Sequence, residues 1–191
     1  MTNKPELYFK NDILWRKWLK VNYNISNGVY LIFYKVENKE PSMRWEEAVK
    51  VALCYGWIDS TVKRIDDERR RQLFTPRKPK SVWSKLNKKH ITELEASKLM
   101  HTSGLHKIEQ AKIDGSWTTL DAVENLIIPD DLQLEFDNNL TAFNNYKAFA
   151  KSYKKGYLYW LHSGKRKATR EKRIAEIIKL CQLNIKTRGT Y

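Results

Sequence analysis

The sequence predicts an α+β protein, in which a small antiparallel or mixed β-sheet with covering helices is followed by a three-helix C-terminal unit. Runs of β-branched and aromatic residues predict strands in the first half of the chain, whereas apolar residues at helical spacing fill the second half. Seven Gly and five Pro in 191 residues, with 41% hydrophobic residues, exclude a disordered or fibrous chain. We expect an α+β domain over residues 1–128 and a helical region over residues 129–191, which could also pack as one compact unit.

The first elements follow from apolar spacing and from capping residues. Residues 10–22 carry apolar side chains near helical spacing, with Asn11 or the next residue as the N-cap. The run GVYLIFYKV over 28–36 predicts a strand that is buried on both faces. A helix is expected over 42–55, with Ser42 as its cap and a Gly directly after its end.

A hairpin is expected next, because two alternating segments, 57–66 and 69–77, flank an acidic turn. Apolar spacing predicts helices in the rest of the chain. Their approximate ranges are 84–100, 105–115, 132–149, 152–163 and 168–182.

The net charge of +14 is concentrated in two segments. Residues 63–89 hold eleven Lys and Arg against three acids, and residues 147–173 hold ten against one Glu. This charge predicts attraction to nucleic acid, anionic lipid heads, phosphorylated metabolites or acidic protein faces. One alternative is a basic surface without a ligand. Another is pairing within the chain, since residues 90–146 hold ten acids against three Lys.

Two prolines stiffen the segment TPRKPKSVWS, residues 75–84, which makes it the strongest candidate for an anion site. Its Arg can hold a phosphate or carboxylate with two hydrogen bonds, its hydroxyls can bind an anion, and its Trp can stack on a base. In the structural alternative, the Trp packs in the core, the last Ser caps the next helix and the charges lie in water. A protein interface is the third interpretation of the segment. The candidate residues are Arg77, Lys78, Lys80, Ser81, Trp83 and Ser84.

The second candidate anion site consists of Lys165, Arg166, Arg170 and Arg173. The three Arg share one helix face if the last helix begins early enough to include the first of them. Like charges at this spacing repel one another. An anionic partner, or an acidic patch on the same chain, would relieve that repulsion.

The sequence contains no Ser-His-Asp order, phosphate-binding loop or dinucleotide fingerprint. Asp59 is a candidate general acid or base beside aromatic residues, and the alternative is a carboxylate that accepts hydrogen bonds from backbone or from an Arg. Cys54 and Cys181 lie in apolar helical patterns, which predicts buried thiols. Because the four His are scattered, we expect no metal site, and we also expect no cofactor and no catalytic residue.

No window approaches the roughly 18 apolar residues of a membrane span, and the N-terminus has no apolar signal segment. We therefore expect a cytoplasmic protein without a transmembrane segment.

Four segments, in the order GWIDS, TPRKPKSVWSKLN, GLHKIEQAKIDGSW and WLHSGKRKATREKRI, resemble the YdeI/OmpD-associated family of bacteria, whose members are described as bacteriocin-protection proteins. The resemblance spans about residues 7–181, and residues 130–187 correspond to the domain that usually defines the family. It implies association and protection rather than a set of catalytic residues. The sequence departs from the family pattern before the last helix, where Gly164 precedes Lys165 in place of an Ala and Ala168 stands in place of an acidic residue, and a helix break is therefore expected near Gly164.

Three functions remain open. The first is a non-enzymatic basic binding protein that engages a polyanion, such as nucleic acid, or an acidic partner in stress or bacteriocin protection. The second is an enzyme acting on a small phosphorylated or carboxylated substrate, with Asp59 as general acid or base and Arg77 as the anion clamp. The third is a protein–protein interaction module whose basic helix docks on an acidic protein.

Overall fold

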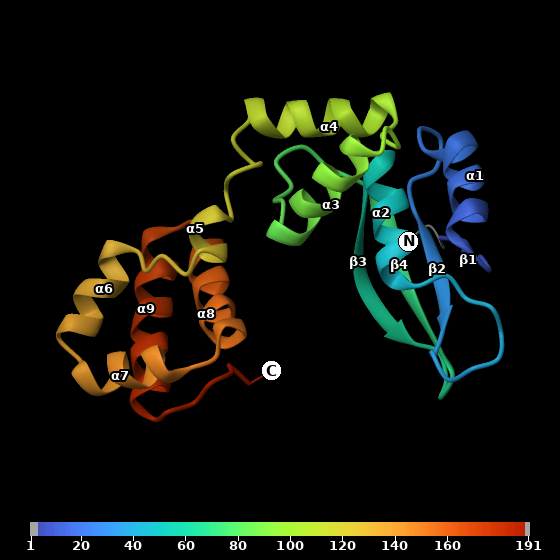
Figure 1. Ribbon diagram of the computed structural model, residues 1–191. Helices are drawn as coiled ribbons and strands as arrows, with labels where there is room; N and C mark the ends of the chain where they lie inside the picture. The colour runs from blue at the N-terminus through green and yellow to red at the C-terminus, as the bar shows by residue number, and fades with distance from the viewer. Residues whose placement is uncertain (1–3, 190–191) are drawn as a thin grey trace. The chain divides into compact units, whose positions relative to one another are not determined.

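The structure of residues 4–189 is a computed structural model, shown in Figure 1. The chain forms two compact units, one ending at Thr118 and the other beginning at Thr119. The sequence predicted this boundary between residues 128 and 129, ten residues closer to the C-terminus than the boundary between the two units. The segment between the two positions belongs with the second unit, because Glu124 on the short helix α5 (Asp121–Glu124) forms an ion pair with Lys155.

The first unit contains a four-stranded mixed sheet with the strand order β1-β2-β4-β3. The strands are β1 (Glu6–Tyr8), β2 (Val29–Tyr34), β3 (Trp57–Arg64) and β4 (Arg69–Pro76). β1 runs parallel to β2, and the pairs β2–β4 and β3–β4 are antiparallel. The expected hairpin is therefore β3–β4, and its turn forms because Asp66 Oδ1 accepts the backbone N–H groups of Glu68 and Arg69.

Strand β2 buries one face completely and the other face partly. Val29, Leu31 and Phe33 are buried, whereas the alternate residues are half-buried. The second face is therefore less enclosed than the hydrophobic run suggests, because side chains such as Arg71, whose guanidinium lies 4.8 Å from the centre of the Tyr30 ring, cover it only in part.

An aromatic cluster joins the sheet to α1 (Asp12–Asn22) and α2 (Trp45–Cys54), the two helices that Figure 1 shows beside it. Trp15 is fully buried, and its Nε1 donates to the carbonyl of Ala48 at 3.2 Å. Its ring also packs against Trp57 and Phe74 from the sheet. The apolar stripes of both helices thus meet the buried face of the sheet.

Local capping explains where these helices begin. Asn11 caps α1, since its side chain accepts the N–H of Leu14, as the sequence predicts. Ser42 does not cap α2: its hydroxyl accepts the N–H of Tyr34 instead. The helix starts three residues later than expected, where the Glu47 carboxylate accepts the N–H of Arg44.

Two further helices complete the first unit, α3 (Lys85–Ala96) and α4 (Thr102–Ile113). α3 ends before residue 100 because Lys98 adopts a left-handed conformation. α4 begins earlier than expected and includes Gly104, whose backbone lies against the carbonyl of Cys54 at the end of α2. Only a residue without Cβ allows this approach.

The second unit is helical. Besides α5 it contains α6 (Asp130–Asp137), α7 (Leu140–Ala148), α8 (Lys151–Ser163) and α9 (Lys167–Gln182). The segment predicted as one helix over 132–149 is two helices, because the Asn139 side chain donates to the carbonyl of Glu135 and ends α6. The expected break near Gly164 separates α8 from α9.

We predict opposite effects for two Gly→Ala substitutions. A Cβ at Gly104 would lie 2.3 Å from the Cys54 carbonyl oxygen, so Gly104→Ala should lower the free energy of unfolding by about 1–3 kcal/mol. Gly156 in α8 has open space around its Cα, so Gly156→Ala should raise it by about 0.5–1 kcal/mol. Urea unfolding followed by circular dichroism measures both, and equal effects would contradict the close contact of α4 with α2.

Candidate anion-binding surfaces

Arg77, the residue directly after β4, is buried, so its side chain does not form an open clamp for an anion. Its backbone N–H donates to the carbonyl of Gly56 at 2.9 Å, and only 3% of the residue is exposed. Its guanidinium carbon lies 3.5 Å from the centre of the Trp83 ring, and Nη1 donates to the carbonyl of Val82 at 3.2 Å. The side chain therefore points into the core and stacks on an aromatic ring.

The charge of Arg77 has no direct counter-ion among residues 4–189, and its Nε and Nη2 atoms are buried without a hydrogen-bond partner there. Burial lowers the pKa of the guanidinium to about 9, and the nearby Asp59 carboxylate acts in the opposite direction. The group still carries its charge at neutral pH. A buried cation without a carboxylate partner is unusual, because desolvation of a charge is expensive.

The rest of the crossover segment, defined as residues 77–84, surrounds a narrow hollow of about 10 Å³ next to Arg77. Lys78 and Lys80 are exposed on its rim. Lys80 adopts a left-handed conformation with φ of 59°, and its N–H donates to Asp114 Oδ2 at 3.1 Å. Ser81 also lines the hollow, together with Lys107 and Ser116 from outside the segment.

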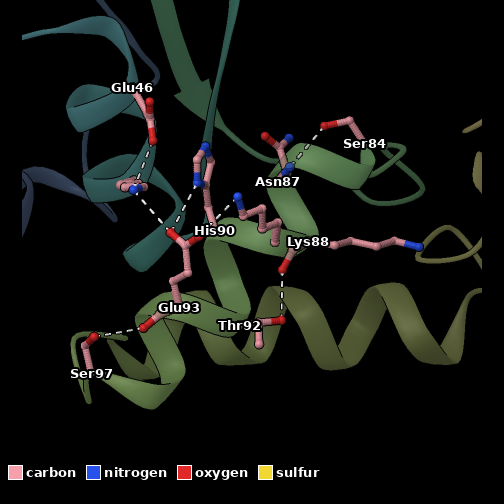
Figure 2. Close-up of polar contacts among 10 residues, drawn as sticks. Glu46, Ser84, Asn87, Lys88, His90, Thr92, Glu93 and Ser97 are labelled. Atoms are coloured by element: carbon pink, nitrogen blue, oxygen red, sulfur yellow. Dashed lines mark hydrogen bonds and ion pairs between the residues drawn. The ribbon is translucent and has the colours of Figure 1, made fainter. Parts of the chain in front are cut away.

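Trp83 and Ser84 have the roles that the structural alternative gave them: Trp83 packs in the core and Ser84 caps a helix. Trp83 is 2% exposed and packs against Trp117, with 5.1 Å between ring centres. Ser84 caps α3, because its hydroxyl accepts the N–H of Asn87 at 3.2 Å (Figure 2). Neither side chain is placed to stack on a base or to hold a ligand.

A polar network beyond this cap ties α3 to α2. Lys50 forms ion pairs with Glu46 at 3.0 Å and with Glu93 at 3.2 Å. Figure 2 shows the Glu93 carboxylate directed toward the buried His90 of the same helix, whose Nδ1 lies 3.7 Å from Glu93 Oε2. The charges of Lys50, Glu46 and Glu93 are thus paired with one another within the first unit.

Asp59 on β3 is held by two neighbouring side chains. Its Oδ2 accepts Trp45 Nε1 at 2.9 Å and also accepts the amide of Gln72. The carboxylate influences Arg77 without forming an ion pair with it. Asp59 is therefore a hydrogen-bonded carboxylate, as in the alternative given for it above, and its Oδ2 is not free to act as a general acid or base on a substrate.

In the second basic segment, Arg170 is paired within the chain. Its Nη2 donates to Asp131 Oδ1 at 2.8 Å, and its Nε donates to the other carboxylate oxygen of that residue. Arg173 donates to the carbonyl of Trp160 and to Ser163 Oγ. Both Arg side chains therefore hold α9 against its neighbours.

Lys165 and Arg166, unlike Arg170 and Arg173, lie before the first residue of α9. α9 begins at Lys167, so Arg166 is its N-cap, and the three Arg do not all lie within the helix. Lys165 and Arg166 are exposed, and neither makes an ion pair within residues 4–189. Two Lys that the sequence did not single out, Lys172 and Lys179, are also exposed on α9 and unpaired in the same range.

A row of aromatic residues on α8 accompanies these charges. Tyr153, Tyr157 and Trp160 recur at helical spacing. An open hollow of about 410 Å³ lies beside Trp160 and Lys172. A second hollow, of about 240 Å³, lies beside the two Tyr residues and Arg188. Arg188 itself lies 3.5 Å from the centre of the Trp160 ring. The helical spacing was visible in the sequence, but which members reach the surface was not.

Three other features bear on the chemistry of the described residues. No group of three or more His, Cys, Asp or Glu is arranged to hold a metal ion in residues 4–189. Cys54 and Cys181 are buried and unpaired, and burial raises the pKa of both thiols, that of Cys181 to about 12, which suppresses thiolate chemistry. None of the described helices combines the length and apolar character that crossing a bilayer requires.

Comparison with protein families gives two matches. Residues 7–107 match a family described as a domain of unknown function (DUF8412). Residues 125–184 match the family described as "Bacteriocin-protection, YdeI or OmpD-Associated", which agrees with the resemblance of the C-terminal motifs. Searches of curated proteins and of solved structures find no match to the chain.

We predict an acid-sensitive contribution of the Asp131–Arg170 pair to stability. The hydrogen bond from Arg170 lowers the pKa of Asp131, so the carboxylate stabilises the folded state above its unfolded pKa of about 3.9. That contribution is lost as the pH falls through the lowered, folded-state pKa. The difference in free energy of unfolding between the wild type and Asp131→Asn should be constant above about pH 5 and shrink as the pH falls below the unfolded value of about 3.9.

Urea unfolding at a series of pH values measures this difference. Asp130→Asn is the matched control, because Asp130 lies in the same helical turn and makes no ion pair within the described range. If the Asp131→Asn difference does not change with pH, or if the control behaves identically, the pair does not form in solution.

Proposed function

This chain belongs to the DUF8412 family and carries a C-terminal YdeI or OmpD-associated region, and on that premise we propose that it is a non-enzymatic binding protein for single-stranded nucleic acid. The α8–α9 surface, defined as Tyr153, Trp160, Lys165, Arg166, Lys172 and Lys179, is the proposed interface. The observation that carries the proposal is the combination on this surface of aromatic rings with cations that lack acidic partners.

The charge of this part of the chain supports a polyanionic partner. Residues 147–191 contain thirteen Lys and Arg against two Glu, a net charge of +11. The acids of the preceding segment neutralise only specific members, as Asp131 does for Arg170 and Glu124 for Lys155. Repulsion among the remaining cations favours the binding of a chain of phosphates, which releases condensed counter-ions.

The aromatic row supports single strands over duplexes. Bases of a single strand can stack on exposed rings, and a ring accepts any base because every base has a π face. Tyr153 is 37% exposed. Trp160 is half-buried, and the guanidinium groups of Arg188 and Arg173 lie 3.5 Å and 5.0 Å from the centre of its ring, so a base would stack on the part of the ring that these side chains leave open. Open hollows beside both residues leave room for a base or sugar.

The proposal includes a role in stress or bacteriocin protection and a cytoplasmic location. The family description of residues 125–184 supports bacteriocin protection, and two unpaired cysteines are in keeping with a cytoplasmic location. The enzymatic alternative has less support, because Asp59 is held by Trp45 and Gln72. An acidic protein partner would use the same cations, and the experiments below distinguish it by the absence of nucleic-acid binding.

We predict that Lys172→Ala/Lys179→Ala weakens single-strand binding and reduces its salt dependence. If each Lys contacts one phosphate, the slope of log K against log salt should become shallower by about 1.4, since each contact contributes about 0.7 for a single strand. Fluorescence anisotropy with a labelled random-sequence oligonucleotide, at several salt concentrations, measures the slope.

The matched control is Lys17→Ala/Lys20→Ala, which removes the same charge from the exposed side of α1. It should leave the slope nearly unchanged. Equal losses in the two double variants would show that only net charge matters. Absence of binding by the wild-type chain even at low salt would exclude the proposed function.

We also predict that Trp160 contributes through stacking. Trp160→Ala should weaken single-strand binding by about 5–150-fold, equivalent to about 1–3 kcal/mol for one stacked base, with little change in salt slope. Tyr159→Ala is the control, because Tyr159 is the neighbouring aromatic residue, is 50% exposed and lies outside the row. Circular dichroism of both variants confirms that α8 is intact. A loss in the control equal to that in Trp160→Ala would rule out the row as the stacking platform.

A further inference from the structure

The guanidinium group of Arg77 is buried inside the first unit with some of its hydrogen-bond donors unpaired. Only 3% of the residue is exposed, and its Nε and Nη2 atoms have no hydrogen-bond acceptor among residues 4–189. Stacking on Trp83 at 3.5 Å and one hydrogen bond to Val82 satisfy only part of the guanidinium. Buried charges in proteins are generally paired or hydrogen-bonded at all their donors, so the missing partner is expected to be an anion or water.

The hollow beside Arg77 has the charge that such an anion requires. Its lining includes Arg77, Lys78, Lys80 and Lys107, against one acid, Asp114. Asp114 is already engaged, because it accepts the N–H groups of Lys80 at 3.1 Å and of Ser116 at 2.9 Å. The lining of the hollow thus contains four cations and one carboxylate, and both oxygens of that carboxylate already accept hydrogen bonds from backbone N–H groups.

We propose that this hollow is a binding site for a phosphoryl group, either inorganic phosphate or the terminal phosphate of a larger molecule. One phosphoryl oxygen enters the hollow and accepts from the free donors of Arg77. The outer oxygens remain at the rim, where the ammonium groups of Lys78, Lys80 and Lys107 reach them.

The size of the hollow determines this mode of binding. About 10 Å³ is room for a single water-sized group, so a whole phosphate does not enter. A tetrahedral oxyanion can still insert one oxygen and leave three outside. The local excess of cations matches a phosphate dianion better than a carboxylate, which has one charge and a single oxygen left for the rim.

Backbone geometry holds the site in this form. Gly56 has φ of +75°, accepts the N–H of Arg77, and leaves the space that the stem of Lys107 occupies, since a Cβ there would lie 2.7 Å from Lys107 Cγ. Lys80 is held in the left-handed region, which residues other than Gly and Asn seldom adopt. Strained backbone of this kind clusters at ligand-binding segments.

The test is calorimetric titration of the full chain with inorganic phosphate, with chloride added to keep the ionic strength constant. We expect saturable binding of one phosphate and a thermal midpoint that rises with phosphate concentration. No saturable binding, or an equal rise in midpoint with chloride alone, would overturn the proposal.

Two variants make the test specific. Arg77→Met should abolish phosphate binding and, in phosphate-free buffer, change the thermal midpoint little, because removal of a buried unpaired charge offsets the lost hydrogen bond to Val82 and the lost cation–π contact with Trp83. Lys107→Ala leaves Arg77 in place and should weaken phosphate binding about tenfold, a loss of about 1.4 kcal/mol. Phosphate binding that survives in both variants would place the anion elsewhere.

The site is independent of the proposed function, because it lies entirely within the first unit. Lys172→Ala/Lys179→Ala should bind phosphate as the wild type does, whatever its affinity for nucleic acid. Competition with a 5′-phosphorylated and an unphosphorylated oligonucleotide identifies the source of the group. Displacement of phosphate by the phosphorylated strand alone indicates a terminal phosphate, no displacement by either indicates the free ion, and equal displacement by both contradicts a phosphoryl-end site.

Discussion

The burial of one guanidinium on one indole organises the first unit. Arg77 follows β4 directly and Trp83 precedes α3, so their stacking at 3.5 Å closes the connection between the sheet and the helices after it. Trp83 in turn packs on Trp117, which follows α4. Because the charge is enclosed together with these rings, the crossover segment must keep one conformation, and the left-handed Lys80 is part of the result.

The two basic segments of the chain consequently differ in physical character. In residues 77–84 the central cation is desolvated, and its remaining donors line a hollow that admits one small group. On α8 and α9 the cations lie mostly in water beside aromatic rings, and only selected members such as Arg170 are neutralised by acids of the same unit. A desolvated cation favours a small, geometrically defined anion, whereas a solvated row favours an extended polyanion.

Local rules predicted the features of this structure that depend on neighbours in sequence. The cap at Asn11, the hairpin around Asp66 and the break near Gly164 are of this kind. The α+β class was predicted because strand and helix periodicities occupy different parts of the chain. β1 was not predicted, since a strand of three residues exists only through its pairing with β2.

The candidate sites were predicted as segments but not as geometries. Composition alone cannot show that Arg77 turns inward, because the outcome depends on Trp83 and on the position of Gly56. Lys107 and Asp114 join the hollow from α4 and the turn after it, about thirty residues away in sequence, without any shared motif. Trp160 was identified as part of a helical pattern, whereas its two flanking Arg side chains are a product of tertiary packing.

If the two basic segments bind different anions, the amide chemical shifts of each segment should respond to a different ligand. The full chain, labelled with ¹⁵N, is titrated with an unphosphorylated single-stranded oligonucleotide and then, separately, with inorganic phosphate. We expect the oligonucleotide to shift amides of α8 and α9 and to leave residues 77–84 unchanged, whereas phosphate should shift residues 77–84 and their neighbour Lys107. Shifts in residues 77–84 with the oligonucleotide, or identical patterns for both ligands, would contradict it.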